Sequence, residues 1–269
     1  MYDFLMNIFV IHVDSHDVRK KQFLMNNPAL KNFSWYRGVE GSNINFTTLV
    51  EKGIISPSLE MIPNSLGLTL TVLELLKICV EINEPITIME DDAIANPNFE
   101  KASETLVESI GKNFDVIFWG WNFDALMWLL PFGEKHPIKI VSDQIHEKEF
   151  LPDFSDNFQD VNHQLIPLGH QWGTMSWSVS PEGARKILDR ILPIDTNPYE
   201  KSHLKLWVKP IAVDELIGKL IPEMLAYTCF PPLCFALNDK TESTIWTEKF
   251  ERTMSKNVTS WFKNLKKFF

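Results

Sequence analysis

Short apolar runs alternate with helix-like segments along most of the 269-residue chain. The apolar runs are rich in Ile, Val, Phe and Trp and predict β-strands at 7–13, 33–41, 86–89, 115–121 and 170–180. Apolar residues at helical spacing, or polar runs with capping residues, predict helices at 16–27, 68–82, 98–111, 181–192 and 212–221. This alternation predicts an α/β fold, in which a mostly parallel sheet carries helices on both faces.

The pattern also predicts how the chain is divided. No linker rich in Ser, Gly or Pro and no internal repeat interrupts residues 1–250, so we expect one domain there. Residues 122–168 are irregular and rich in Asp, Asn, His and Pro, which predicts a long insertion with loops over the site. Residues 251–269 form a basic amphipathic tail. Either residues 256–269 attach to a membrane surface, or the tail packs on the domain as a C-terminal helix.

Composition narrows the possible functions. A formal net charge of −9 and an isoelectric point near 5.3 argue against a nucleic-acid partner, which needs a basic face. Cys79, Cys229 and Cys234 lack metal-ligand spacing and lie in apolar stretches, which predicts reduced thiols. The N-terminal segment lacks a basic signal-peptide region, and no run reaches the ~18 apolar residues of a membrane span. We therefore expect a cytoplasmic protein, with the tail either in peripheral contact with the membrane or packed on the domain.

Three acidic residues follow the predicted strand in the stretch "ITIMEDDAIANP" at 86–97. Ligands of open α/β sheets gather at the carboxyl ends of strands, where an acidic cluster suits Mn²⁺ or Mg²⁺. Alternate residues of an extended chain point the same way, so we expect Glu90 and Asp92 to hold the metal while Asp91 turns aside to pair locally. The alternative interpretation is a solvated acidic turn.

Four segments in order resemble glycosyltransferase family 25: "IFVIHVDSHDVRKKQF", "LGLTLTVLELL…PITIMEDDAI", "WGTMSWSVSPEGARKIL" and "PPLCFALNDKTESTI". The resemblance covers roughly residues 7–245 and implies a GT-A-like fold with a Rossmann-like nucleotide-sugar half. It also implies a UDP-sugar donor, commonly UDP-galactose, and inversion at the anomeric carbon. Val72 stands where the family has His, and Trp177 stands where it usually has Tyr.

The resemblance implies which residues bind the donor. Asp14 or its backbone would contact the base or ribose, and Arg19 would face a phosphate or an acid. Gly67 and Thr71 match the glycine and the hydroxyl of a family motif in the second predicted helix. Asp91 completes this expected set.

The remaining expected site residues would contact the donor sugar or accept the proton of the acceptor hydroxyl. Gly173 and Thr174 precede a predicted strand, and a glycine there permits close approach of the backbone to a sugar. An inverting transfer needs a base for the acceptor hydroxyl. Asp214, at a helix start where the family also has an acid, is the first candidate, and His170 is the second.

Aromatic residues after the strand at 115–121 suggest an acceptor site, because sugars stack on aromatic rings. We expect Trp121 to line it and Asn122 to bind hydroxyls, with core packing as the alternative for the tryptophan. The combined hypothesis is a metal-dependent hexosyltransferase that moves galactose from a UDP-sugar to a saccharide such as bacterial lipooligosaccharide. The alternatives are a non-catalytic carbohydrate- or nucleotide-binding protein on the same fold, or a transferase with a protein or modified nucleic-acid acceptor.

Overall fold

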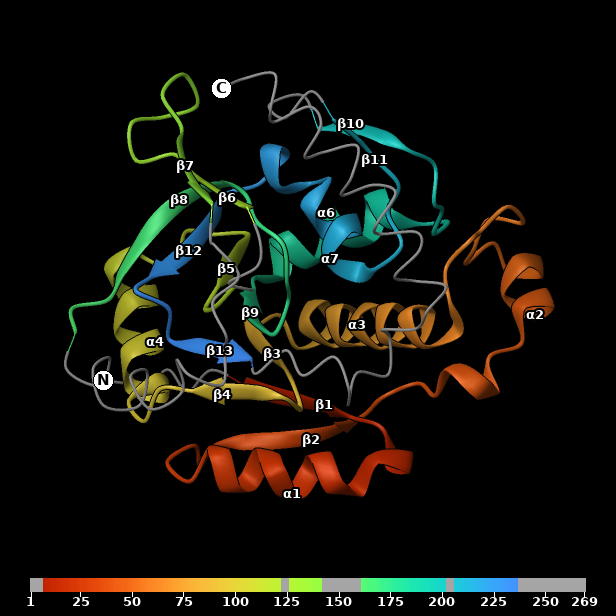
Figure 1. Ribbon diagram of the computed structural model, residues 1–269, viewed down its shortest axis with the longest axis horizontal. Helices are drawn as coiled ribbons and strands as arrows, with labels where there is room; N and C mark the ends of the chain where they lie inside the picture. The colour runs from red at the N-terminus through yellow and green to blue at the C-terminus, as the bar shows by residue number, and fades with distance from the viewer. Residues whose placement is uncertain (1–6, 122–125, 142–160, 202–205, 237–269) are drawn as a thin grey trace.

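A nine-stranded sheet forms the centre of the computed structural model, which describes residues 7–121, 126–141, 161–201 and 206–236 (Figure 1). The strand order is β2-β1-β3-β9-β5-β12-β8-β6-β7, and β4 pairs with β13 and β10 with β11 in two small sheets. The strands are β1 (Asn7–His12), β2 (Phe33–Arg37), β3 (Ile86–Glu90), β4 (Ala93–Ala95), β5 (Val116–Phe118), β6 (Leu126–Leu129), β7 (Ile138–Val141), β8 (Gln164–His170), β9 (Ser176–Val179), β10 (Tyr199–Lys201), β11 (Leu206–Val208), β12 (Ala226–Phe230) and β13 (Cys234–Ala236).

Helices cover both faces of this sheet, as predicted. Phe23 of α1 packs edge-on against Phe33 and Trp35 of β2, whereas the hydroxyl of the next residue, Tyr36, donates to Glu74 of α3. Because successive strand residues point to opposite faces, α1 and α3 lie on opposite sides of the sheet (Figure 1). The helices are α1 (Asp17–Asn26), α2 (Phe46–Glu51), α3 (Pro63–Ile82), α4 (Phe99–Ser109), α6 (Pro181–Ile191) and α7 (Val213–Gly218), with short 3₁₀ turns at η1 (Asp14–His16), η2 (Gly41–Asn43) and η3 (Ile221–Glu223).

Most strands of the sheet run in one direction, which confirms the predicted mostly parallel α/β class. Strands β1, β2, β3, β5, β12 and β6 share a direction, and β9, β8 and β7 run the other way. The reversed strand β9 lies between β3 and β5, so it begins at the edge where β3 ends. This reversal brings the segment before β9 beside the acidic triplet.

The predicted insertion at 122–168 is wrong in part, because β6, β7 and most of β8 fall inside it and extend the sheet. The apolar pattern is weak there because β7 is an edge strand and β8 contains Pro167 and polar residues. Residues 122–125 and 142–160 lie outside the described residues. Helix α3 also begins earlier than predicted, at Pro63, which fits the first turn because its missing N–H needs no partner there.

The predicted start of α6 is confirmed. Ser180 caps α6 by accepting a hydrogen bond from the Gly183 N–H at 3.0 Å, with Pro181 at the first helical position. The three cysteines are buried and free of disulfides. No helix in the described ranges is long and apolar enough to cross a membrane. The tail at 251–269 lies outside the described residues.

Candidate active site

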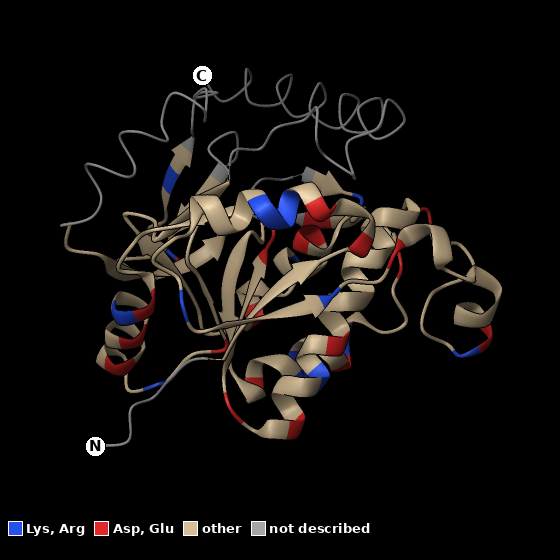
Figure 2. Cartoon of the chain, turned by 90° about the horizontal axis from the view of Figure 1, so that it is seen from below, with Lys and Arg blue, Asp and Glu red and all other residues tan. Residues whose placement is uncertain are grey.

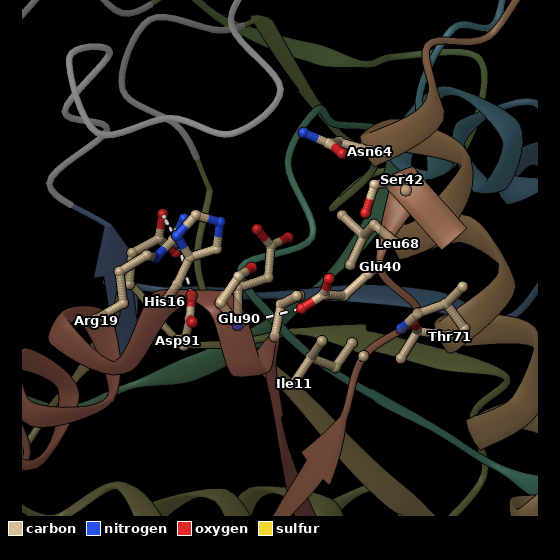
Figure 3. Close-up of a pocket in the computed structure, with 16 residues that line it drawn as sticks. Ile11, His16, Arg19, Glu40, Ser42, Asn64, Leu68, Thr71, Glu90 and Asp91 are labelled. Atoms are coloured by element: carbon tan, nitrogen blue, oxygen red, sulfur yellow. Dashed lines mark hydrogen bonds and ion pairs between the residues drawn. The ribbon is translucent and has the colours of Figure 1, made fainter. Parts of the chain in front are cut away.

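A pocket of about 160 Å³ opens at the edge of the sheet where β1 and β3 end. Residues 11–19, which follow β1 into α1, and the acidic triplet form one side, and residues 38–42 with the first turns of α3 form the other. Figure 3 shows Arg19, Glu90 and Asp91 on one side of the pocket and Ser42, Asn64, Leu68 and Thr71 on the other.

Arg19 and His12 hold the middle acid of the triplet. The Arg19 Nη2 atom lies 2.6 Å from Asp91 Oδ1 and 3.0 Å from Asp92 Oδ2, and His12 Nδ1 lies 3.1 Å from Asp91 Oδ2. Asp91 is buried, whereas the side chain of Asp92 is 41% exposed at the pocket. The arrangement agrees with the expectation that Asp91 pairs locally, and it gives Arg19 an acidic partner.

Glu90 is the least compensated acid of the site. Its Oε1 atom accepts a hydrogen bond from the Thr174 hydroxyl at 3.1 Å. The pKa of Glu90 is raised to about 8, chiefly by burial, then by repulsion from Asp92 and, to a lesser extent, from Asp214. The Thr174 hydrogen bond and Arg19 act in the opposite direction without cancelling the shift. Charge repulsion from two other carboxylates therefore reaches this one side chain.

Gly173 and Thr174, in the segment that precedes β9, also lie at this site. The Gly173 N–H donates to Asp214 Oδ2 at 3.1 Å, and the backbone of Gly173 has a φ of +88°, which favours glycine. The N–H of Glu90 donates to the carbonyl of Met175 at 2.9 Å, which aligns the two segments. The structure thus brings together Glu90, Asp92, Gly173, Thr174 and Asp214.

The opposite wall depends on Gly67 and Thr71. A Cβ atom at Gly67 would collide with the Val39 carbonyl oxygen, so the glycine lets α3 pack directly against residues 38–42. The Thr71 hydroxyl accepts from the Val39 N–H and donates to the Gly67 carbonyl, both at 2.8 Å. Thr71 lines the pocket, whereas Gly67 supports the wall from behind.

Three expected site residues in the described part of the chain, Asp14, His170 and Trp121, are held by other contacts and do not line the pocket. Asp14 is exposed and pairs with Arg37 Nε at 2.8 Å. His170 is buried edge-on against Trp172, and Trp121 is 5% exposed with its ring stacked on that of Phe230. For Trp121 the packing alternative describes the structure better than an open acceptor platform. Asn122 lies outside the described residues.

Sequence reasoning missed other pocket residues. Glu40 and Ser42 follow β2 at the same sheet edge, so the rule that sites gather at strand ends identifies them. Glu40 accepts a hydrogen bond from the Ser15 N–H at 3.2 Å. Asn64 carries no such signal, because its place depends on the contact of α3 with Gly41. His12 contacts Asp91, but its place at the end of an apolar strand gives no sign of this contact in the sequence.

The residues present suit a cation that a substrate helps to bind. Across the described part of the chain, no three His, Cys, Asp or Glu side chains converge on one point. Glu90 and Asp92 remain the available carboxylates, because both oxygens of Asp91 are engaged. Mg²⁺ and Mn²⁺ are held in many enzymes by one or two carboxylates together with substrate phosphates. The repulsion around Glu90 is a property that a bound cation would relieve.

The two departures from the family pattern lie in the core. Val72 is 2% exposed, and Trp177 is fully buried, with its ring stacked on Phe118. Neither residue lines the pocket. These substitutions therefore concern packing, and they leave the acids and the pocket in place.

Comparisons with known proteins address the family. The sequence model of glycosyltransferase family 25, described as LPS biosynthesis protein, matches residues 6–217. No curated protein matches the sequence. Among solved structures, A197 from STIV is similar over 83% of this chain and 81% of its own, with 9% identity and a TM-score of 0.36. The glycosyltransferase GlyE of Streptococcus pneumoniae TIGR4 is similar over 89% of this chain and 47% of its own, with 8% identity and a TM-score of 0.30.

Both TM-scores are too low to carry an argument, so the family match decides the assignment. That match spans most of the chain and includes both strands that frame the acids. The chain therefore belongs to glycosyltransferase family 25 and is a transferase enzyme.

Proposed function

We propose that the protein is a metal-dependent, inverting hexosyltransferase that moves galactose from UDP-galactose to a saccharide of a lipooligosaccharide. The observation that carries the proposal is the pocket in which Glu90, Asp92 and Arg19 face one another at the carboxyl edge of the sheet. Its size and its mixed lining of charged, polar and apolar residues suit part of a nucleotide sugar, with the diphosphate beside Arg19.

Glu90 and Asp92 would hold Mn²⁺ or Mg²⁺ together with the donor's phosphates. The bound ion would supply Lewis-acid neutralisation of the leaving diphosphate. Thr174 orients Glu90 through its hydroxyl, and Asp91 keeps Arg19 beside Asp92. The chain's own contribution is thus a fixed pair of carboxylates and one guanidinium.

Asp214 is the proposed base. Its carboxylate is oriented by the N–H groups of Gly173 and Glu215, at 3.1 and 2.9 Å, and it lies near enough to Glu90 to raise the pKa of that acid. In an inverting transfer, Asp214 would accept the proton of the acceptor hydroxyl while the hydroxyl oxygen attacks the anomeric carbon opposite the diphosphate. His170 is less suited, because it is buried against Trp172.

The choice of galactose and of a lipooligosaccharide acceptor rests on the family. Its description as LPS biosynthesis protein favours a glycolipid acceptor, and the acidic chain gives no support to nucleic acid. Such an acceptor stays at the membrane surface. A basic tail at 256–269 that attaches to the cytoplasmic face would therefore bring the enzyme to its substrate.

Donor hydrolysis tests the proposal. UDP-, GDP- and CMP-sugars are incubated with the wild type and with Asp92→Asn, in Mn²⁺ and in EDTA. We expect slow hydrolysis of UDP-galactose that EDTA abolishes and that Asp92→Asn lowers about 100-fold. Asp189→Asn, an exposed residue of α6, is the matched control and should retain the wild-type rate. Hydrolysis that persists in EDTA would contradict the proposed dependence on a metal ion. Turnover of a different sugar nucleotide would contradict UDP-galactose as the donor.

A further inference from the structure

His12 is a buried polar residue to which the proposed reaction assigns no role. It lies at the end of β1, is 5% exposed, and packs edge-on against Trp35 with the ring centroids 5.6 Å apart. Its Nδ1 atom is 3.1 Å from Asp91 Oδ2. A buried histidine at the end of a mostly apolar strand that contacts an acid of the site calls for an explanation beyond packing.

The hydrogen on this imidazole is assigned by its surroundings. Asp91 also accepts from the Arg19 guanidinium through its other oxygen, so it is the acceptor in its contact with His12. His12 Nδ1 therefore carries the hydrogen and donates. His12 Nε2 is buried without a partner among the described residues, which suits a bare acceptor better than an N–H group. In this arrangement Nδ1–H is hydrogen-bonded and no N–H of the ring is buried without an acceptor, so His12 supplies a hydrogen bond to Asp91.

This bond completes a chain of contacts that ends in the pocket. With Oδ2 bound to His12 and Oδ1 bound to Arg19, the Asp91 carboxylate is fixed at both oxygens. The same Arg19 nitrogen reaches Asp92, and Arg19 lines the pocket with 17% of its side chain exposed. A long arginine side chain has many rotamers, and a carboxylate that cannot rotate restricts them.

We propose that His12 is a positioning residue for the sugar-nucleotide donor: through Asp91, it holds the Arg19 guanidinium where the donor diphosphate binds. The proposal rests on the proposed function in taking the ligand to be a nucleoside diphosphate. His12 itself touches no substrate. Its loss leaves Asp91 free to rotate and Arg19 free to leave the pocket wall, so the donor binds more weakly.

Two variants separate this role from packing. His12→Asn keeps an N–H donor near the position of Nδ1 but leaves a small void, whereas His12→Leu fills the space better and donates nothing. We expect His12→Leu to weaken UDP binding in Mn²⁺ about 10-fold or more, and His12→Asn to stay within about 3-fold of the wild type. Calorimetry gives the Kd values, and thermal denaturation shows that each variant is folded.

The opposite order, with Leu tolerated and Asn not, would show that His12 only packs, and equal binding by all three proteins would overturn the proposal as well. A wild type that binds none of UDP, GDP and CDP would instead overturn the proposed donor site, so the two failures are distinct.

A measurement without nucleotide gives an independent test. Long-range ¹H–¹⁵N correlation spectra of the ¹⁵N-labelled wild type report which ring nitrogen of each histidine carries the hydrogen. The His12 signals are assigned by their absence from His12→Asn. We expect the Nδ1–H form for His12, and an Nε2–H form would overturn the proposed contact with Asp91.

Discussion

Two acidic residues of this molecule, Asp115 and Glu90, differ in how their carboxylates are compensated by neighbouring groups. Asp115, just before β5, is 2% exposed, and both of its oxygens contact Lys186 Nζ, at 2.9 and 2.8 Å. Its Oδ2 atom also accepts the Leu225 N–H at 2.8 Å. Within the described structure, the Glu90 carboxylate accepts one hydrogen bond, from Thr174, and it faces the charges of Asp92 and Asp214.

The difference shows how the fold separates structural acids from functional ones. Asp115 joins α6 to the segment before β12, and its charge is balanced by Lys186. Glu90 lines the pocket beside Asp92 and Asp214, and burial and repulsion there make the ionised form of this carboxylate costly for the folded state. Such a cost is typical of functional sites, and under the proposed function a bound cation would offset it.

The largest effect on stability is expected at the structural acid. Lys186→Met leaves a buried carboxylate with a single backbone partner, which should lower the free energy of unfolding by about 2–3 kcal/mol. The value is below that of a fully buried pair because the Lys186 side chain is 41% exposed. Urea denaturation measures the change, with the exposed Lys101→Met of α4 as control. Donor turnover per folded molecule should stay unchanged. A loss of turnover in the folded variant would contradict a purely structural role for Asp115 and Lys186.

A smaller effect is expected from pH at the functional acid. The pKa of Glu90 is raised from 4.5 to about 8 in the folded protein, so the folded state binds this proton more tightly than the unfolded chain. Its contribution to stability is complete below pH 4.5 and is lost as the pH rises through about 8. In EDTA, the wild type should therefore lose more stability than Glu90→Gln between pH 5 and pH 8, by more than about 1 kcal/mol.

Denaturation curves of the two proteins at both pH values measure this difference. Mn²⁺ with UDP should reduce it, because a cation stabilises the ionised carboxylate. Parallel loss of stability in the wild type and in Glu90→Gln would contradict the raised pKa.

The smallest effect is expected at Asp14. Its pair with Arg37 is exposed on both sides, so Asp14→Asn should change the free energy of unfolding by less than about 1 kcal/mol. Because the carboxylate points to Arg37 and not into the pocket, the KM for the donor should change less than about 3-fold. A rise of 10-fold or more would restore the expectation that this carboxylate contacts the base or ribose.

Features that depend on neighbouring residues in the chain, such as helix starts and strand ends, could be predicted from the sequence. Ser180 and Pro181 fixed the start of α6, and the buried strand before Glu90 placed the acids at a sheet edge. The choice of Asp214 as the base rests on its place at a helix start in a region where the family has an acid, and its role stays a prediction. These predictions needed no knowledge of how distant segments pack.

The remaining features depend on tertiary contacts. Trp121 follows a strand in a way that suits either stacking on sugar or packing, and only the position of Phe230 decides. Asn64 reaches the pocket because α3 packs on Gly41, and His12 matters because Asp91 lies beside it. Figure 2 shows basic and acidic residues spread over many helices and loops of the chain, with both signs present in several places. Net charge alone therefore does not locate the site.

Manganese binding tests the contrast between the two acids most directly. Electron paramagnetic resonance counts the Mn²⁺ bound in the presence of UDP by the wild type, by Glu90→Gln and by Asp115→Asn. The account predicts one ion per chain for the wild type and for folded Asp115→Asn, with affinity at least about 10-fold lower for Glu90→Gln. Equal binding by all three proteins would contradict the claim that the unbalanced acids at the pocket form the metal site.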